Sequence, residues 1–412
     1  MSTSSRSSRP VKSLRVLLVS AEFPPMQGGV GDYTRELGRG LVRLGHSVGV
    51  LTSTKATHTE PGLTVFPIVG RWDYGWWGEL MSAVNEMRAD ILHVQYQTAA
   101  YGMHPAVNML PLRMRTESRR PCTVITYHDL RVPYLFPKAG ALRRWITQQP
   151  AHWYDAAIVT NVEDSLQLSK ANMRFHLIPI GSNIATALPP AYDRAAWRNK
   201  LGVLPDDMLL CYFGFLNESK GADTLMRALW ELVSANRAVK VLMLGGQVGD
   251  SDRTNAAYLK HVKKLITDLH LDEYVIWTGF ILDEEVSAGL VASDAAVLPY
   301  RDGASYRRGS FMAALSHNLP IISTKGPGTA SLASVPNIQA DADLPGLLDG
   351  DNVLLVPPDD PSAVSRAVIR LIANPSLIQR LSANARLLAH SFEWDTIARR
   401  TSAVYEELAG SN

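Results

Sequence analysis

The sequence predicts an α/β protein built from two Rossmann-like, doubly wound parallel-sheet domains that face each other. Short β-branched apolar segments alternate with longer amphipathic segments from residue 15 onward, as strands and helices alternate in a parallel sheet. The alternation stops at residues 183–207, which contain Pro189, Pro190 and Pro205, and then restarts. A chain of 412 residues is also too long for one compact core, so two to three domains are expected.

These segments divide the chain into a tail, two domains and a final helix. Residues 1–13 are rich in Ser and Arg without an apolar core, which indicates a flexible tail and excludes a secretory signal. Residues 14–185 are the predicted front domain and residues 186–390 the second domain. Residues 391–412 are expected to contain a helix, near 394–408, that packs back on the front domain. The expected strands are 15–20, 47–53, 63–69, 91–96, 122–127, 157–160 and 177–180, then 209–215, 239–244, 275–280, 295–299, 320–324 and 352–356.

Composition indicates an ordinary globular protein. The chain is 46% hydrophobic and 19% charged, and no apolar run approaches the ~20 residues that span a bilayer. Cys122 and Cys211 lie in separate apolar segments, which favours buried thiols in a reducing cytoplasm over a disulfide or a metal site. Residues 1–185 carry 20 Lys and Arg against 13 Asp and Glu, but no recognition motif accompanies this excess, so nucleic acid is not an expected partner.

Two polar segments follow strands of the front domain. Gly28 and Gly29 come after the first strand and open a helix, where backbone N–H groups can approach an anion; a tight turn with Asp32 near the helix start is the alternative. His128 and Asp129 come after the fifth strand, at the edge where α/β sheets bind ligands. His128 can donate to a hydroxyl group or help to stabilise a developing positive centre, and a histidine bonded only within its loop is the alternative.

Lys220 is the candidate anion ligand after the first strand of the second domain. It opens a helix, where a cation is unfavourable for the helix dipole unless an anion shares the site. A compact ammonium there can hold the diphosphate of a leaving group. Pairing with Glu218 is the alternative.

Arg307 and Arg308 stand at the start of an apolar helix, after the strand that ends near Pro299. Their guanidinium groups match phosphate oxygens, and the N–H groups of Gly309 and Ser310 add to the cradle. Solvent exposure, or pairing with Asp302, is the alternative for both arginines.

Taken together, these segments resemble the retaining glycosyltransferases of GT-B architecture, especially glycosyltransferase family 4. The resemblance extends from Arg15 to about Tyr405, and the order and spacing of its motifs make it specific. Those motifs are Pro24-Pro25 with Gly28-Gly29, Thr126-x-His128, residues 178–183, Gly214-x-Leu216 with Lys220-Gly221, residues 277–280, residues 283–285, residues 293–299 and residues 319–322.

The resemblance implies a nucleoside-diphosphate sugar donor held by the second domain and a hydroxyl acceptor held by the first. It implies retaining, front-face transfer without a metal or other cofactor, with His128, Lys220 and Arg308 as the catalytic residues. The implied donor-binding residues are Gly28, Gly29, Gly214, Lys220, Gly246, Phe280, Ile281, Asp302, Ser305, Arg307, Arg308, Gly309 and Ser310. The implied acceptor-binding residues are Asp32, Tyr33, His128 and Asp129.

Three departures from the family pattern lie in the donor site. Ser305 and Ala313 stand where the family has two glutamates, and Phe215 stands where it has an arginine. Arg307 and Arg308 appear in the same segment, so we expect Arg308 to replace the lost positive charge and Asp302 or Ser305 to take over a sugar contact.

These departures keep two other functions open: a non-catalytic GT-B protein that binds a nucleotide sugar, and another GT-B enzyme such as an epimerase. The acceptor is expected to be a glycan, a lipid-linked or a small molecule. Basic residues near apolar ones suggest a cytoplasmic protein that makes peripheral contact with the inner membrane face. The alternative is that these residues form a solvated helix face. The residues concerned are Arg113, Arg115, Arg119, Arg120, Tyr134, Leu135, Phe136, Lys138, Arg143, Arg144 and Trp145.

Overall fold

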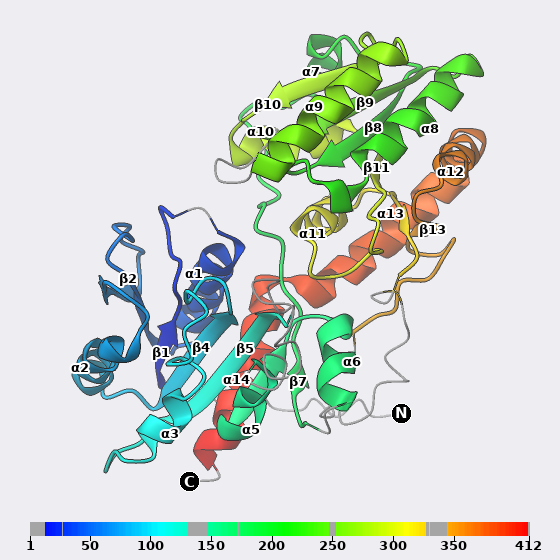
Figure 1. Cartoon of the computed structure of the whole chain (residues 1–412). Helices are drawn as coiled ribbons and strands as arrows, with labels where there is room; N and C mark the ends of the chain where they lie inside the picture. The colour runs from blue at the N-terminus through cyan, green and yellow to red at the C-terminus, as the bar shows by residue number, and fades with distance from the viewer. Residues whose placement is uncertain are drawn as a thin grey trace, which may run out of the picture.

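The computed structural model describes residues 13–26, 28–130, 147–170, 173–246, 253–326, 329 and 344–410. Within these ranges the chain forms two parallel α/β sheets, which lie in the lower and upper halves of Figure 1. The prediction of two Rossmann-like domains is therefore confirmed.

The first sheet has seven strands in the order β3-β2-β1-β4-β5-β6-β7, and every neighbouring pair is parallel. The central strands are almost entirely buried. The continuous apolar run of β1 fits burial on both faces, whereas β4 and β5 also carry polar side chains. The strands are β1 (Arg15–Val19), β2 (Ser47–Ser53), β3 (Leu63–Val69), β4 (Ile91–Gln97), β5 (Cys122–Asp129), β6 (Ala156–Val159) and β7 (His176–Leu177).

The second sheet has six strands in the order β10-β9-β8-β11-β12-β13, again all parallel. These are β8 (Met208–Phe213), β9 (Val239–Leu244), β10 (Val275–Gly279), β11 (Ala295–Leu298), β12 (Ile321–Thr324) and β13 (Leu354–Val356). In each sheet the order reverses beside the first strand, at β1/β4 and at β8/β11. Ligands of open α/β sheets bind beyond the carboxyl ends of the strands at such a reversal.

Helices cover both sheets. Those in and around the first sheet are α1 (Gly29–Arg43), α2 (Trp77–Met87), α3 (Leu110–Met114), α5 (Pro150–Trp153) and α6 (Val162–Lys170). Those of the second half are α7 (Arg194–Lys200), α8 (Ala222–Ser234), α9 (Arg253–Asp268), α10 (Asp283–Ala292), α11 (Gly309–Ser316), α12 (Pro361–Ala373), α13 (Pro375–Ala389) and α14 (Trp394–Gly410).

Three of the differences from the predicted strand bounds occur at prolines. The strand expected at 177–180 ends at Leu177, two residues before Pro179, and Pro299 and Pro320 lie just outside β11 and β12. Proline has no N–H to donate to a neighbouring strand, so it falls outside the ladder. In the opposite direction, β5 continues to Asp129, so His128 belongs to the strand and not to the loop after it.

The last helix, α14, lies against the first sheet, as the red helix beside β4 and β5 in Figure 1 shows. Tyr405 on α14 is fully buried, and its hydroxyl lies 2.6 Å from Nδ1 of His93 on β4. Ser402 bonds Nε2 of His46 at 2.8 Å. The final helix of the chain thus completes the core of the first domain.

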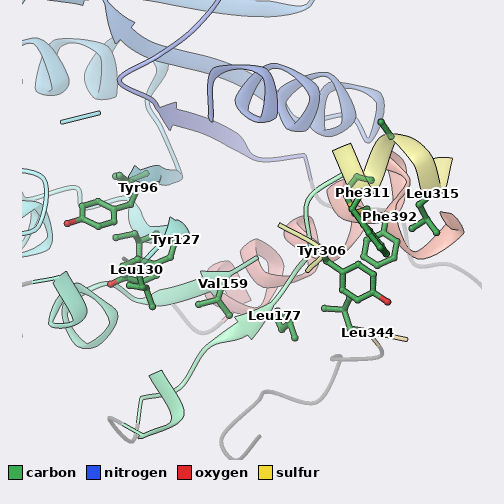
Figure 2. Close-up of a cluster of buried hydrophobic side chains, with 14 of the residues drawn as sticks. Tyr96, Tyr127, Leu130, Val159, Leu177, Tyr306, Phe311, Leu315, Leu344 and Phe392 are labelled. Carbon is green, nitrogen blue, oxygen red and sulfur yellow. The ribbon is translucent and has the colours of Figure 1, made fainter. Parts of the chain in front are cut away.

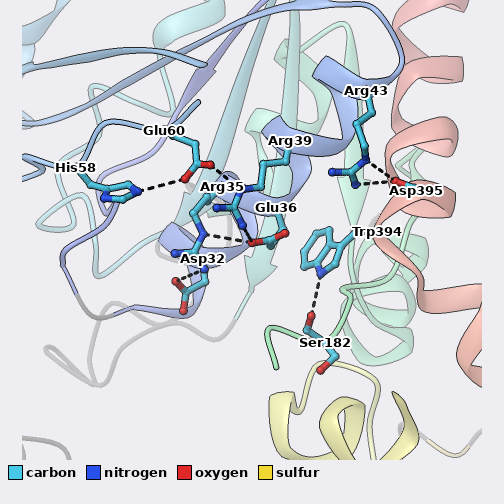
Figure 3. Close-up of polar contacts among 10 residues, drawn as sticks. All are labelled: Asp32, Arg35, Glu36, Arg39, Arg43, His58, Glu60, Ser182, Trp394 and Asp395. Carbon is cyan, nitrogen blue, oxygen red and sulfur yellow. Dashed lines mark hydrogen bonds and ion pairs between the residues drawn. The ribbon is translucent and has the colours of Figure 1, made fainter. Parts of the chain in front are cut away.

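The chain crosses between the domains twice, and the two crossings meet at Trp394. Its indole N–H donates to the carbonyl oxygen of Ser182 at 2.8 Å, as Figure 3 shows. A Cβ atom on Gly181 would lie 2.7 Å from the indole, so a larger residue would displace the ring. Arg43 on α1 pairs with Asp395 at 2.6 Å and holds the start of α14.

One hydrophobic core continues from the first domain into the second. Tyr96 and Tyr127 belong to it in the first sheet, and Tyr306, Phe311 and Phe392 extend it across the junction (Figure 2). The crossings are therefore packed against both domains. Both cysteines are buried thiols outside any disulfide, as predicted.

Candidate active site

The carboxyl ends of β8 and β11 bring the predicted anion ligands together. Gly214 follows β8, and its backbone φ of +104° suits glycine. A Cβ atom there would lie 2.8 Å from the ammonium nitrogen of Lys220, so glycine leaves room for that ammonium. Gly221 allows the turn before α8 to approach β11, because a Cβ atom on it would lie 2.1 Å from the carbonyl oxygen of Pro299.

Lys220 is an ammonium with no ion pair or hydrogen bond among the residues that the structure describes. Burial and the neighbouring Arg308 lower the pKa of Lys220 to about 8. Glu218, its alternative partner, pairs instead with Arg301 at 2.7 Å. The arrangement suits an anion that supplies the missing negative charge.

Arg308 caps the start of α11 and lies beside Lys220. Its guanidinium pairs with Asp302 and lies 4.9 Å from the ring centre of Tyr300, and its Nε has no partner among the described residues. The Tyr300 hydroxyl bonds Ser310 in the first turn of α11 at 2.7 Å. The amino end of α11, Arg308 and Lys220 therefore lie together beside Gly214, where an anion would be stabilised by all three.

Arg307 joins the two domains. It pairs with Asp302 at 3.1 Å and with Glu163, at the start of α6 in the first domain, at 3.7 Å. The side chains of Arg307 and Glu163 are 14% and 15% exposed. Both arginines thus pair with Asp302, as one alternative expected, and neither points to solvent.

His128 lies on the first-domain side, near the carboxyl end of β5. Its Nε2 lies 3.0 Å from the side-chain oxygen of Gln95 on β4. Burial lowers the pKa of His128 to about 3, so the imidazole is neutral at physiological pH. The ring of Tyr33 on α1 meets it edge-on, with 4.6 Å between the ring centres.

The Gly28–Gly29 loop differs from a simple phosphate loop. A Cβ atom on Gly28 would lie 2.0 Å from a carboxylate oxygen of Glu22, so this acid occupies the side of the loop. Burial, with a contribution from Asp32, raises the pKa of Glu22. A phosphate on that side of Gly28 would be disfavoured by the carboxylate charge.

Comparison with known proteins places this arrangement in a family. Residues 28–179 match the family described as "Glycosyl transferase 4-like domain", and residues 207–374 match the one described as "Glycosyl transferases group 1". The chain belongs to these group 1 glycosyltransferases. The predicted family and its GT-B fold are therefore confirmed.

Two relatives match nearly the whole of this chain. The D-inositol 3-phosphate glycosyltransferase of Xylanimonas cellulosilytica is 25% identical, with 95% of this chain and 96% of that protein covered. The phosphatidyl-myo-inositol mannosyltransferase of Mycolicibacterium smegmatis is 23% identical, with 97% and 95% covered. Other relatives, from Streptomyces, are matched over about half of their length, as in the 44% covered in Streptomyces bingchenggensis.

Among solved structures, an Anabaena protein in complex with UDP has a TM-score of 0.71 and 16% identity. The match covers 96% of this chain and 100% of that one. At this identity the likeness concerns the fold of the glycosyltransferase.

The far end of the predicted donor site lies after β9 and β10. Gly245 and Gly279 form a backbone bridge between these two ends. A Cβ atom on Gly246 would lie 2.9 Å from the ring of Phe215, so this ring covers the glycine; Phe280 is 81% exposed. The predicted donor residues Ser305 and Ile281 are buried and half-buried, respectively.

Sequence reasoning missed three side chains of this glycosyltransferase that contact predicted site residues: Gln95, Glu163 and Glu22. Gln95 and Glu163 stand near the carboxyl edge of the first sheet, the same signal that identified His128. Glu22 follows β1 in the same way. Their places near strand ends could be predicted from the sequence, whereas their contacts depend on how distant segments pack.

No group of three or more metal-ligating side chains occurs in the described part of the glycosyltransferase, and no helix within it could span a membrane. Of the basic residues that suggested membrane contact, three pair with acids of the same domain: Arg113 with Glu117, Arg119 with Asp90 and Arg120 with Asp155. The other members of that group between 131 and 146 lie outside the described residues: Tyr134, Leu135, Phe136, Lys138, Arg143, Arg144 and Trp145.

The Arg307–Glu163 pair predicts an effect on the contact between the two domains. Glu163→Gln removes the charge, and we expect this contact to weaken by about 1 kcal/mol, which is about a fivefold shift toward molecules in which the contact is broken. Small-angle scattering would show an increased radius of gyration. Glu117→Gln, which breaks the Arg113 pair inside the first domain, is the control and should leave the radius unchanged. Equal radii for Glu163→Gln and the wild type would contradict the prediction.

Proposed function

We propose that the protein is a retaining glycosyltransferase that moves a sugar from a nucleoside-diphosphate sugar to a hydroxyl acceptor. The observation that carries the proposal is the ammonium of Lys220, half-buried without a partner in the described structure, beside Arg308 and the amino end of α11. Unpaired buried charge is costly, so a site of this kind suits a diphosphate. The Anabaena structure with UDP supports the same ligand class.

In the proposed reaction the bond between the sugar C1 and the diphosphate oxygen breaks, and the acceptor oxygen bonds C1 on the same face. The acceptor proton passes to the departing phosphate oxygen. Lys220 and Arg308 stabilise the negative charge that grows on the diphosphate, because fixed cations in a water-poor site need no reorganisation. Neutral His128, near the carboxyl end of β5 in the first domain, is proposed to face the developing positive centre of the sugar.

The two cations also supply the charge that a divalent metal supplies in other transferases, so we propose a metal-independent reaction. Activity is then expected to survive a chelator.

The acceptor side is proposed to lie at Asp32, Tyr33, His128 and Asp129. The two full-length relatives are named for inositol 3-phosphate and phosphatidyl-myo-inositol, which supports a polyol or lipid-linked hydroxyl acceptor over a protein one. A lipid-linked acceptor would require the protein to visit a membrane surface, and we propose the cytoplasmic face.

A thermal-shift screen against UDP, GDP, ADP and TDP and their common sugars tests the donor class. At about 100 times its dissociation constant, the true donor should stabilise the fold by about 2.7 kcal/mol. Arg308→Ala is expected to lose the response. Lys264→Ala, which removes an exposed lysine paired with Asp268, is the matched control and should keep it.

Failure of every nucleotide to stabilise the wild type would contradict the proposed donor site. Stabilisation by a nucleotide sugar without any release of the nucleoside diphosphate would favour the non-catalytic alternative. Release of the nucleoside diphosphate with an acceptor would eliminate that alternative. Analysis of the sugar product would separate transfer from epimerisation.

A further inference from the structure

Four polar side chains form two cross-strand pairs on the face of the first sheet that α14 covers. His93 and Gln95 lie two residues apart on β4, so their side chains share one face of the sheet. Thr126 and His128 have the same spacing on the neighbouring β5. His93 bonds Thr126 at 2.7 Å, and Gln95 bonds His128 at 3.0 Å. The first pair lies inside the core, and the second lies at the carboxyl edge, where the proposed site begins.

The hydrogen bond between Gln95 and His128 has a defined direction. The side-chain oxygen of Gln95 can only accept, so Nε2 of His128 must carry the proton that it receives. A neutral imidazole has one N–H, and His128 is neutral here. Its Nδ1, on the other side of the ring from Gln95, therefore holds a lone pair.

Gln95 is an unfavourable residue for packing alone. It is fully buried, and its amide nitrogen has no partner among the described residues. A buried donor without an acceptor destabilises a fold, and leucine would fill similar space without that cost. The residue is therefore explained by what its oxygen does for His128.

We propose that Gln95 is a positioning residue that holds His128 as its Nε2–H tautomer and fixes the ring against Tyr33, so that Nδ1 presents an acceptor. This rests on the proposed function, in which His128 faces the transferred sugar. The lone pair of Nδ1 would accept a hydrogen bond from a sugar hydroxyl. Nδ1 would also lie near the developing positive centre of the sugar without placing a proton of its own there. The other tautomer would present a donor instead.

The groups around His128 leave its neutral form undisturbed. Tyr33 faces it from α1, and burial raises the pKa of that phenol. His93, on β4, has a pKa lowered to about 3 by burial and by His128 itself, and Tyr405 from α14 bonds His93. Asp129, the next residue of β5, is the nearest acid along the chain. A new charge at position 95 would therefore dominate the titration of His128.

Two substitutions separate positioning from packing. Gln95→Leu removes the acceptor, and we expect both tautomers of His128 and a fall in kcat of about tenfold to a hundredfold with an unchanged donor KM. Gln95→Glu places a carboxylate beside Nε2 and raises the pKa of His128, so a new acidic limb should enter the pH–rate profile. Tyr405→Phe, which removes the neighbouring buried hydrogen bond to His93, is the control and should leave the His128 tautomer and pH profile unchanged.

The tautomer is read directly from the nitrogen chemical shifts of ¹⁵N-histidine-labelled protein, with His128→Gln assigning the signals. The expected wild-type spectrum shows a protonated Nε2 and an unprotonated Nδ1 for His128. A protonated Nδ1 in the wild type, or an unchanged tautomer in Gln95→Leu, would overturn the proposal. Because this measurement needs no donor, it remains decisive even if the nucleotide screen fails.

Discussion

Lys220→Met is expected to abolish nucleotide stabilisation while leaving the ligand-free protein at least as stable as the wild type. The ammonium has no partner to lose in the described structure, and methionine fills a similar volume without a buried charge. Without Lys220, one preorganised cation that stabilises the leaving diphosphate is missing, and kcat/KM should fall by about 10²- to 10³-fold. Melting curves with and without nucleotide, followed by kinetics, measure both effects. Lys264→Met, on the exposed Asp268 pair, is the control.

The same ammonium makes the behaviour depend on pH. Its pKa is about 8 in the folded protein against 10.5 ordinarily, so the folded state releases this proton first. Below pH 8 the lysine is charged in both states and its burial destabilises the fold; between about 8 and 10.5 that destabilisation is progressively relieved. A diphosphate requires the charged form, so its affinity should weaken as pH rises through 8. A dissociation constant that does not change between about pH 7 and about pH 9.5 would contradict this role for Lys220.

Tyr405→Ala is expected to destabilise the first domain by about 3–5 kcal/mol. The tyrosine is fully buried, and its removal leaves a cavity between α14 and the sheet as well as an unpaired nitrogen on His93. A domain with a total stability of about 5–15 kcal/mol would then be close to unfolding. Calorimetry should show one transition shifted to lower temperature.

The control for this prediction is the other core. Leu381 on α13 is buried in a cluster made only of second-domain residues, so Leu381→Ala should destabilise that domain instead. If Tyr405→Ala and Leu381→Ala shift the same transition equally, the two domains unfold as one unit, and α14 does not act on the first domain alone.

Much of this structure follows from local sequence. Strands β2 and β9 were predicted at their observed bounds, because apolar β-branched runs ended by turn residues are unambiguous when both faces of a sheet are buried. The same regularity predicted where His128, Lys220 and Arg308 would stand, since strand ends in a parallel sheet share one edge.

Contacts between distant segments could not be predicted this way. Whether Arg307 reaches Glu163 depends on how closely two domains approach, and whether Gln95 reaches His128 depends on the register of β4 against β5. The carboxylate of Glu22 beside Gly28 depends on the path of the loop after β1. Each is a property of packing in three dimensions, which no single segment encodes.

The position of α14 has a consequence for how the protein is made. During synthesis the strands of the first sheet leave the ribosome early, but the face that Ile397, Ala398 and Tyr405 cover stays open until the chain beyond residue 394 has emerged. The second sheet can therefore be complete while the first still exposes apolar surface. The domain that is synthesised first is therefore the last to finish folding, because its final helix follows the whole second domain in the chain.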